Sequence, residues 1–126
     1  EKLNKCSKKN QFVMGKLEED FEDLFNFVIS GNLAIAQLQL KEYTNVNFKN
    51  SSKSTLLITA CRSKANEKKI LSFVKFLLKK GAYIMKKDSS GRTAVDYSEQ
   101  NKLFQVKMLL CKTLDSILME NIANFF

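Results

Sequence analysis

Apolar residues recur at helical spacing in several short segments of the chain. Leu33, Ala36 and Leu40 lie three or four residues apart, so they share one face of a predicted helix. A later segment, residues 73–80, repeats this spacing and runs into Gly81, a residue type that often ends helices in a left-handed conformation. The pattern predicts short amphipathic helices separated by turns.

Turn-forming residues separate these helical segments. Asp88–Gly91 predicts a turn, because Gly tolerates a positive φ and an Asp side chain can bond the nearby backbone. Thr93 can then begin a helix as its N-cap. We therefore expect three helix pairs, with a loop over 63–69: 23–30 with 33–41, 55–62 with 70–80, and 93–100 with 103–111. The apolar residues expected in the core are Phe25, Val28, Leu57, Ala60, Val74, Leu77, Val95, Val106 and Leu110.

These segments resemble ankyrin repeats. Asp88–Ser98 follows the first half of the family pattern, D-x-x-G-x-T-P-L-H-x-A, and Asn50–Ala60 follows it in degraded form. Residues 31–47 follow the second half of the pattern, a helix that leads into a finger. Because spacing and residue type match together, the resemblance covers about residues 20–111.

The family's threonine position sets the register of the repeats. It falls at Glu22, Thr55 and Thr93, at intervals of 33 and 38 residues. The first interval is the family period. The second is five residues longer, which places extra residues within the 63–69 loop.

The resemblance implies an all-α ankyrin-repeat solenoid: three helix-pair repeats with short β-turn fingers and capping helices. One helix pair cannot bury its apolar face, and about three stacked pairs are the minimum for a stable array. The expected division is a basic N-terminal flank over 1–15, a repeat domain over 16–111 and a C-terminal amphipathic capping helix over 112–126. Within the domain the repeats cover about 20–49, 50–87 and 88–111.

The chain departs from the family at two kinds of position. It has no His and no Pro, so the T-P-L-H tetrad reads T-L-L-I at Thr55–Ile58 and T-A-V-D at Thr93–Asp96. Helix starts must then rely on Thr alone. Asp96 can still accept a backbone hydrogen bond, whereas Ile58 cannot.

Both ends of the repeat region carry amphipathic helical patterns. A first helix is expected to start near Lys16. At the other end, Leu114, Ile117, Leu118 and Ile122 form one apolar stripe. We expect this stripe to cap the last repeat; the alternative is a helix that binds a partner or joins two copies of the chain as a homo-oligomer.

Charge makes the repeat region basic. The 126 residues carry 21 Lys and Arg against 13 Asp and Glu, a formal charge of +8. Residues 24–114 alone hold sixteen cations and five acids, net +11. Only two of the cations, Arg62 and Arg92, are arginines. Solvated lysine faces explain most of this charge. The weaker alternative is a basic domain that binds nucleic acid or an anionic membrane surface, although nucleic-acid recognition usually uses Arg and stacked aromatic rings.

The chain lacks the residue patterns of catalysis. Without His, the commonest general base and most zinc sites are missing. The four Gly never cluster into a phosphate loop. We therefore expect no enzyme activity, no cofactor and no metal. Three isolated cysteines favour a reducing compartment, cytoplasmic or nuclear, and no uncharged run is long enough to span a membrane.

Protein binding is the function that remains. The resemblance places partner contacts on the fingers and first helices, with Arg62 and Arg92 as the main cations for an acidic or amphipathic segment. Tyr83 and Met85 are a second candidate, although Tyr83 could instead pack on the neighbouring finger. A purely structural spacer that acts through its flanking helices is the alternative from another class. The full set of expected contact residues is Lys49, Ser51, Ser52, Ser54, Arg62, Ser63, Tyr83, Met85, Lys87, Ser89, Ser90, Arg92, Gln100 and Asn101.

Overall fold

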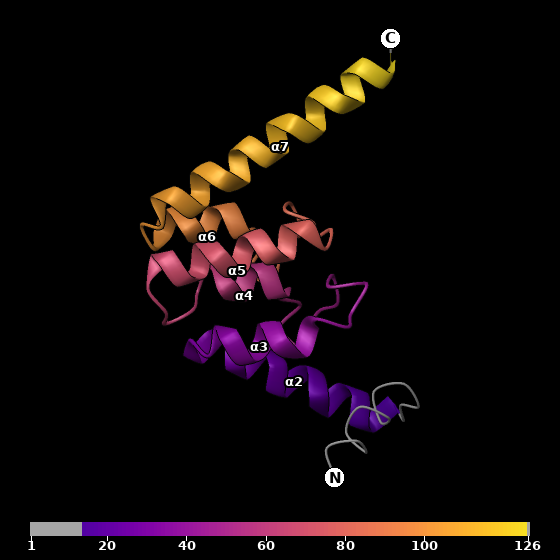
Figure 1. The fold of residues 1–126 in the computed structure, drawn as a ribbon, viewed down its shortest axis with the longest axis vertical. Coiled ribbons are helices and arrows are strands. Elements are labelled where there is room, and N and C mark those ends of the chain that lie inside the picture. Colours follow the sequence, from indigo (N-terminus) through magenta and orange to yellow (C-terminus); the bar gives the residue numbers. More distant parts are fainter. Residues whose placement is uncertain (1–13, 126) are drawn as a thin grey trace.

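Stacked helix pairs make up the protein (Figure 1). The computed structural model describes the backbone of residues 14–125 and the side chains of residues 21–121. Across the described residues, the chain forms helices and one isolated antiparallel bridge, between Lys49 and Thr55. The helices are α2 (Met14–Ser30), α3 (Leu33–Leu40), α4 (Leu56–Ala60), α5 (Glu67–Lys79), α6 (Ala94–Gln100) and α7 (Phe104–Phe125). The all-α prediction is confirmed.

The helices form two rows, as a solenoid requires. Consecutive helices pair as α2 with α3, α4 with α5 and α6 with α7. The first helices of the pairs contact each other in the order α2, α4, α6, and the second helices in the order α3, α5, α7. Each pair therefore buries its apolar faces against its neighbours, so the fold is confirmed as a three-pair helical solenoid.

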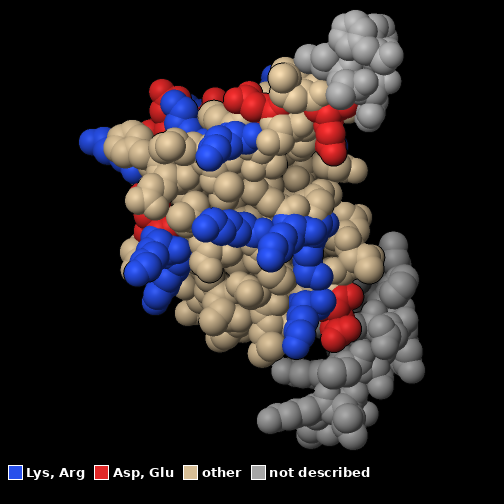
Figure 2. Space-filling model, turned by 45° about the horizontal axis from the view of Figure 1, so that its top comes forward, with Lys and Arg blue, Asp and Glu red and all other residues tan. Residues whose placement is uncertain are grey.

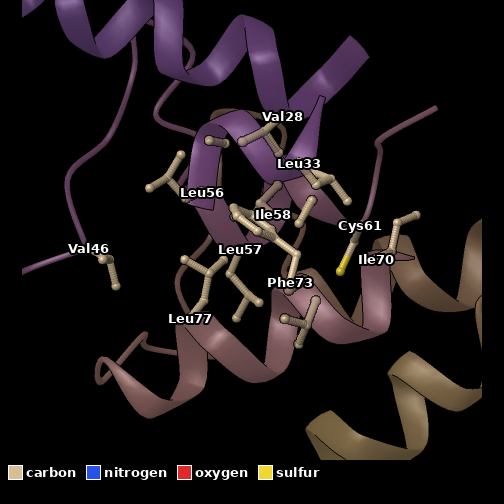
Figure 3. Close-up of a cluster of buried hydrophobic side chains, with 14 of the residues drawn as sticks. Val28, Leu33, Val46, Leu56, Leu57, Ile58, Cys61, Ile70, Phe73 and Leu77 are labelled. Carbon is tan, nitrogen blue, oxygen red and sulfur yellow. The ribbon is translucent and has the colours of Figure 1, made fainter. Parts of the chain in front are cut away.

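One continuous core runs through the stack. Figure 3 shows the part of it around α4 and α5. Of the predicted core residues, all are buried except Val95, which is half-buried. Val95 lies on α6, in the last pair of the stack. Phe73 and Ile58 are also fully buried, at 1% exposure each. Ile58, which replaces the family's His, therefore adds apolar area to the core instead of a hydrogen bond.

Threonine caps begin the first helices of the second and third pairs. Thr55 Oγ1 accepts a hydrogen bond from the N–H of Ile58 (3.2 Å). Thr93 Oγ1 accepts one from Asp96 (3.2 Å), and Asp96 Oδ2 accepts one in return from the Thr93 N–H (3.0 Å). This reciprocal pair is a capping box. The backbone bond predicted for Asp96 is confirmed.

The predicted loop over 63–69 is shorter than expected, because α5 begins at Glu67. The Asn66 side chain accepts a hydrogen bond from the Lys69 N–H (2.9 Å) and starts the helix there. The loop turns back to the end of α2, where the Lys64 N–H donates to the Ile29 carbonyl (3.0 Å). Gly31, at φ +97°, allows this approach: a Cβ there would lie 3.2 Å from the backbone nitrogen of Ala65.

A long helix, α2 or α7, lies at each end of the array. α2 starts at Met14, slightly before the predicted start near Lys16. Residues 104–111 and 112–125 form one helix, α7, rather than two. Leu114 packs on the core, but Ile117 and Leu118 are 47% and 57% exposed. The predicted capping role is therefore wrong beyond Leu114, because α7 runs past the body (Figure 1).

Candidate functional site

Two turns between helices, the fingers at residues 49–55 and 87–93, have the same internal hydrogen bonds and carry most of the predicted contact residues. In the first, Asn50 Oδ1 accepts from the N–H groups of Ser52 (2.9 Å) and Ser54 (3.0 Å). In the second, Asp88 Oδ1 accepts from the N–H groups of Ser90 (3.0 Å) and Arg92 (3.1 Å). Such turns hold the finger tips in fixed positions.

The finger tips lie side by side. The Ser89 N–H donates to the Ser52 carbonyl (3.1 Å), which joins the two fingers. Ser54 is only 2% exposed, and its hydroxyl bonds that of Thr59 (3.2 Å). Its predicted role in partner contact is therefore wrong, because it supports the helix start from inside. The other predicted finger residues are exposed: Lys49, Ser51, Ser52, Lys87, Ser89 and Ser90.

Both arginines converge on one aromatic ring. The guanidinium carbon of Arg62 lies 5.1 Å from the centroid of the Tyr97 ring, and that of Arg92 lies 5.9 Å from it. Arg92 also donates to Gln100 Oε1 (3.0 Å). Arg62, at the end of the first helix of repeat two, and Arg92, in the finger of repeat three, thus form one cationic cluster on an aromatic base.

Tyr97 also holds the finger through its hydroxyl. The hydroxyl donates to Asp88 Oδ2 (2.6 Å) and lies 3.2 Å from the Ser90 hydroxyl. Partial desolvation acts to raise the pKa of Asp88. The hydrogen bonds from Tyr97, Ser90 and the Arg92 N–H outweigh it and hold this pKa well below its usual range. Asp88 is therefore a carboxylate at neutral pH, held by bonds within its own finger.

Sequence reasoning missed Tyr97, which is 7% exposed and lies on α6, with its hydroxyl bonded to the second finger. The available signal was its place four residues after the N-cap Thr93, one turn along the same short helix. Its use as a base for two arginines depends on the stacking of two repeats. No local pattern encodes that arrangement.

The two remaining predicted residues of this side are partly used within the protein. Asn101 is exposed, but its amide donates to the Cys61 carbonyl (2.9 Å) and so joins repeats two and three. The Ser63 hydroxyl accepts from the Ala65 N–H (3.2 Å). Both residues therefore shape the surface beside Arg62.

Tyr83 and Met85 form a separate exposed apolar pair, at 59% and 58% exposure. The Tyr83 backbone N–H donates to Asn47 Oδ1 (2.7 Å), while the Lys86 amine lies 5.5 Å from its ring centroid. The backbone of Tyr83 is thus tied to its neighbour, whereas its ring is not packed away. The alternative of a ring packed on the adjacent finger is wrong.

Positive charge extends well beyond the arginine cluster. Figure 2 shows Lys and Arg side chains in several groups across one face, with most of the acidic side chains of that view near one edge.

Cys61 lies inside the protein, and burial raises the pKa of its thiol to about 12. Within residues 14–125, no helix is both long enough and apolar enough to cross a bilayer.

Comparisons with known proteins give relatives of the fold. The chain aligns with a structure of the predatory endopeptidase Bd0816 from Bdellovibrio bacteriovorus in complex with immunity protein Bd3460, at 27% identity and a TM-score of 0.60. It also aligns with EF0377, an ankyrin repeat protein, at 29% identity and a TM-score of 0.60. These alignments cover 71% and 70% of this chain but only 44% and 45% of the solved chains, so this chain spans less than half their length. A search of curated proteins gave no match.

A family model settles the family. The model for ankyrin repeats in three copies matches residues 24–119, most of the chain, and this range includes all three helix pairs from Leu24 onwards. The resemblance predicted from the threonine spacing is confirmed. The chain belongs to the ankyrin-repeat family.

Proposed function

We propose that this protein is an interaction module that docks an acidic segment of a partner protein on the finger side of repeats two and three. The observation that carries the proposal is the pair of arginines over Tyr97, with guanidinium carbons 5.1 and 5.9 Å from the ring centroid. Ankyrin repeats are generally protein-binding modules. One structural neighbour comes from a complex between an endopeptidase and an immunity protein, which supports a binding role.

The chemistry of the cluster favours carboxylates. A guanidinium can hold a carboxylate with two parallel hydrogen bonds, whereas a Lys amine makes a point contact on a more flexible stem. Arg92 is already held by Gln100 and by the ring, so it loses little freedom when a ligand binds. The adjacent hydroxyl of Ser89 is exposed and offers a donor for a further oxygen, whereas the Ser90 hydroxyl already donates to Asp88 Oδ1 (2.7 Å).

The lysines elsewhere have a different expected role. With a net +11 over residues 24–114, the body attracts an acidic segment from a distance and speeds association. Such a field is lost with salt and does not select an orientation. Affinity at the arginine cluster should depend on geometry, so the two contributions can be separated by experiment.

A labelled oligoglutamate peptide provides the probe, with fluorescence anisotropy as the readout. The Arg62→Lys/Arg92→Lys variant keeps both charges but loses the guanidinium geometry. We expect the affinity of this variant for the peptide to fall by about tenfold or more, because that is the effect of losing roughly one charged hydrogen bond.

The matched control is Lys75→Gln/Lys79→Gln, which removes two charges from exposed positions on α5. We expect a loss of about twofold, through the weaker long-range field. If Lys75→Gln/Lys79→Gln lost more affinity for the peptide than Arg62→Lys/Arg92→Lys, net charge alone would explain binding and the proposed site would be wrong.

A further inference from the structure

The last helix presents an apolar face that the chain itself leaves uncovered. On α7, Val106 and Leu110 are buried against the repeat body. Phe104 and Met108, which lie one turn apart on the other side of the helix, are 61% and 65% exposed. Further along, Met119 is 65% exposed. This outer face of α7 lies at the end of the stack (Figure 1).

The exposed face has the spacing of a helix–helix seam. Met108, Lys112, Asp115 and Met119 follow each other at intervals of four, three and four residues. This alternation keeps side chains along one seam when two helices wrap around each other with left-handed crossing. All four residues are exposed.

We propose that this face of α7 binds a second copy of the same chain, as an antiparallel helix pair with two-fold symmetry. The two-fold axis of this pair passes through the midpoint between Thr113 and Leu114. Met108 and Met119 lie equally far from this midpoint on either side. In an antiparallel pair that crosses there, Met108 of each copy faces the partner subunit's Met119, because a two-fold contact is reciprocal.

The charges on the same face fit this arrangement. Lys112 and Asp115 are also equally far from the midpoint, so Lys112 of each copy lies opposite the partner subunit's Asp115. A parallel pair would instead set two lysines, and then two acids, against each other. Asp115 stands in the seam itself, where a carboxylate needs a cation once it is desolvated. Within the part of the chain that the structure describes, neither Lys112 nor Asp115 forms an ion pair.

The test is a pair of charge reversals in the full chain, with mass measured by sedimentation equilibrium. Lys112→Glu sets two pairs of acids in contact across the dimer, and Asp115→Lys sets two pairs of lysines in contact. Each variant alone should raise the dissociation constant by about tenfold or more, since like charges opposite each other oppose association.

An equimolar mixture of the two variants should dimerise again. In the mixed pair, the two altered positions face each other with opposite charges at one contact, and the unaltered Lys112 and Asp115 face each other at the second contact, so both contacts are again complementary. Lys75→Glu, on the exposed side of α5, makes the same charge change away from α7 and should leave the dimer unchanged. Circular dichroism checks that each variant keeps its helices.

Three results would overturn the proposal. The parent chain could remain monomeric up to about 1 mM, a range that includes weak complexes. The single variants could dimerise as the parent does, which would place the contact elsewhere. The mixture could remain monomeric while the parent dimerises, which would exclude the antiparallel pairing.

Discussion

The carboxylate of Glu67, at the start of α5, accepts a hydrogen bond from the backbone N–H of Gln105, at the start of α7 (2.7 Å). The same oxygen lies 3.3 Å from the N–H of Val106. Leu103, the residue before α7, has no side-chain acceptor, so the last helix would otherwise begin with unsatisfied donors. Repeat two thus supplies the cap of a helix in repeat three.

Glu67→Ala should therefore destabilise the whole array. Loss of a helix cap costs about 0.5–2 kcal/mol, and here the cap also joins two repeats. Chemical denaturation followed by circular dichroism measures the effect. Glu42→Ala, an exposed acid in the segment after α3, is the matched control and should change stability by less than about 0.5 kcal/mol. Equal effects of the two variants would show that the Glu67 bond contributes nothing.

Leu77 is a fully buried core residue of α5. It is 0% exposed on α5, whose neighbours are α3, α4 and α7. Leu77→Ala should cost about 2–5 kcal/mol, a large share of the stability of a small domain. Leu38 on α3 is 70% exposed, so Leu38→Ala is the matched control. It removes the same atoms from the surface and should lower the free energy of unfolding far less. Similar melting temperatures for the two variants would contradict the register of the repeats.

The bond between Tyr97 and Asp88 should give the protein an acid-sensitive stability. The native pKa of Asp88 lies below that of an unfolded Asp, about 3.9. Its contribution is then complete above that pH and is lost as pH falls towards the native pKa, because the unfolded chain binds the proton more tightly. Tyr97→Phe should lower stability at neutral pH and flatten the fall between about pH 5 and pH 2.

Tyr83→Phe is the control for this measurement, because it removes a hydroxyl from a 59% exposed ring. It should leave both the stability and its pH dependence unchanged. Unfolding by urea at a series of pH values measures both variants. An unchanged acid slope in Tyr97→Phe would mean that other carboxylates dominate the titration.

Cys61 should resist thiol reagents in the native protein. It is 1% exposed, and burial raises its pKa to about 12, so the reactive thiolate is scarce near neutral pH. In a Cys6→Ser/Cys111→Ser variant, Ellman's reagent should react with Cys61 only as fast as the protein opens. Added urea should restore full reactivity. Rapid labelling without urea would contradict the packing between α4 and its neighbours.

Much of the fold follows from local sequence signals. The threonine spacing, the apolar periodicity and Gly81 predicted the helix pairs, because caps and stops act within a few residues. α5 starts three residues before the predicted position because Asn66 caps it, and Asn before an acidic residue is a usual helix start. Nothing in residues 111–114 breaks a helix, so the continuity of α7 was also readable from the sequence.

The candidate site was only partly predictable. Arg62 and Arg92 were found through the family's contact positions, but their meeting over Tyr97 depends on how far one repeat rotates against the next. Ser54 was misassigned for a related reason: its turn is exposed, while its own hydroxyl points inward to Thr59. Exposure of Ile117 and Leu118 likewise depends on where the stacked body ends.

Mapping the acidic probe onto the protein by NMR tests the central proposal most directly. An oligoglutamate peptide titrated into the isotopically labelled chain should shift the amides around Arg62, Arg92 and Tyr97, with the largest changes on the finger side. The same titration of the Arg62→Lys/Arg92→Lys variant should show much smaller shifts there. Shifts concentrated on the lysines of α5 or on the outer face of α7, and equal in both proteins, would contradict the account.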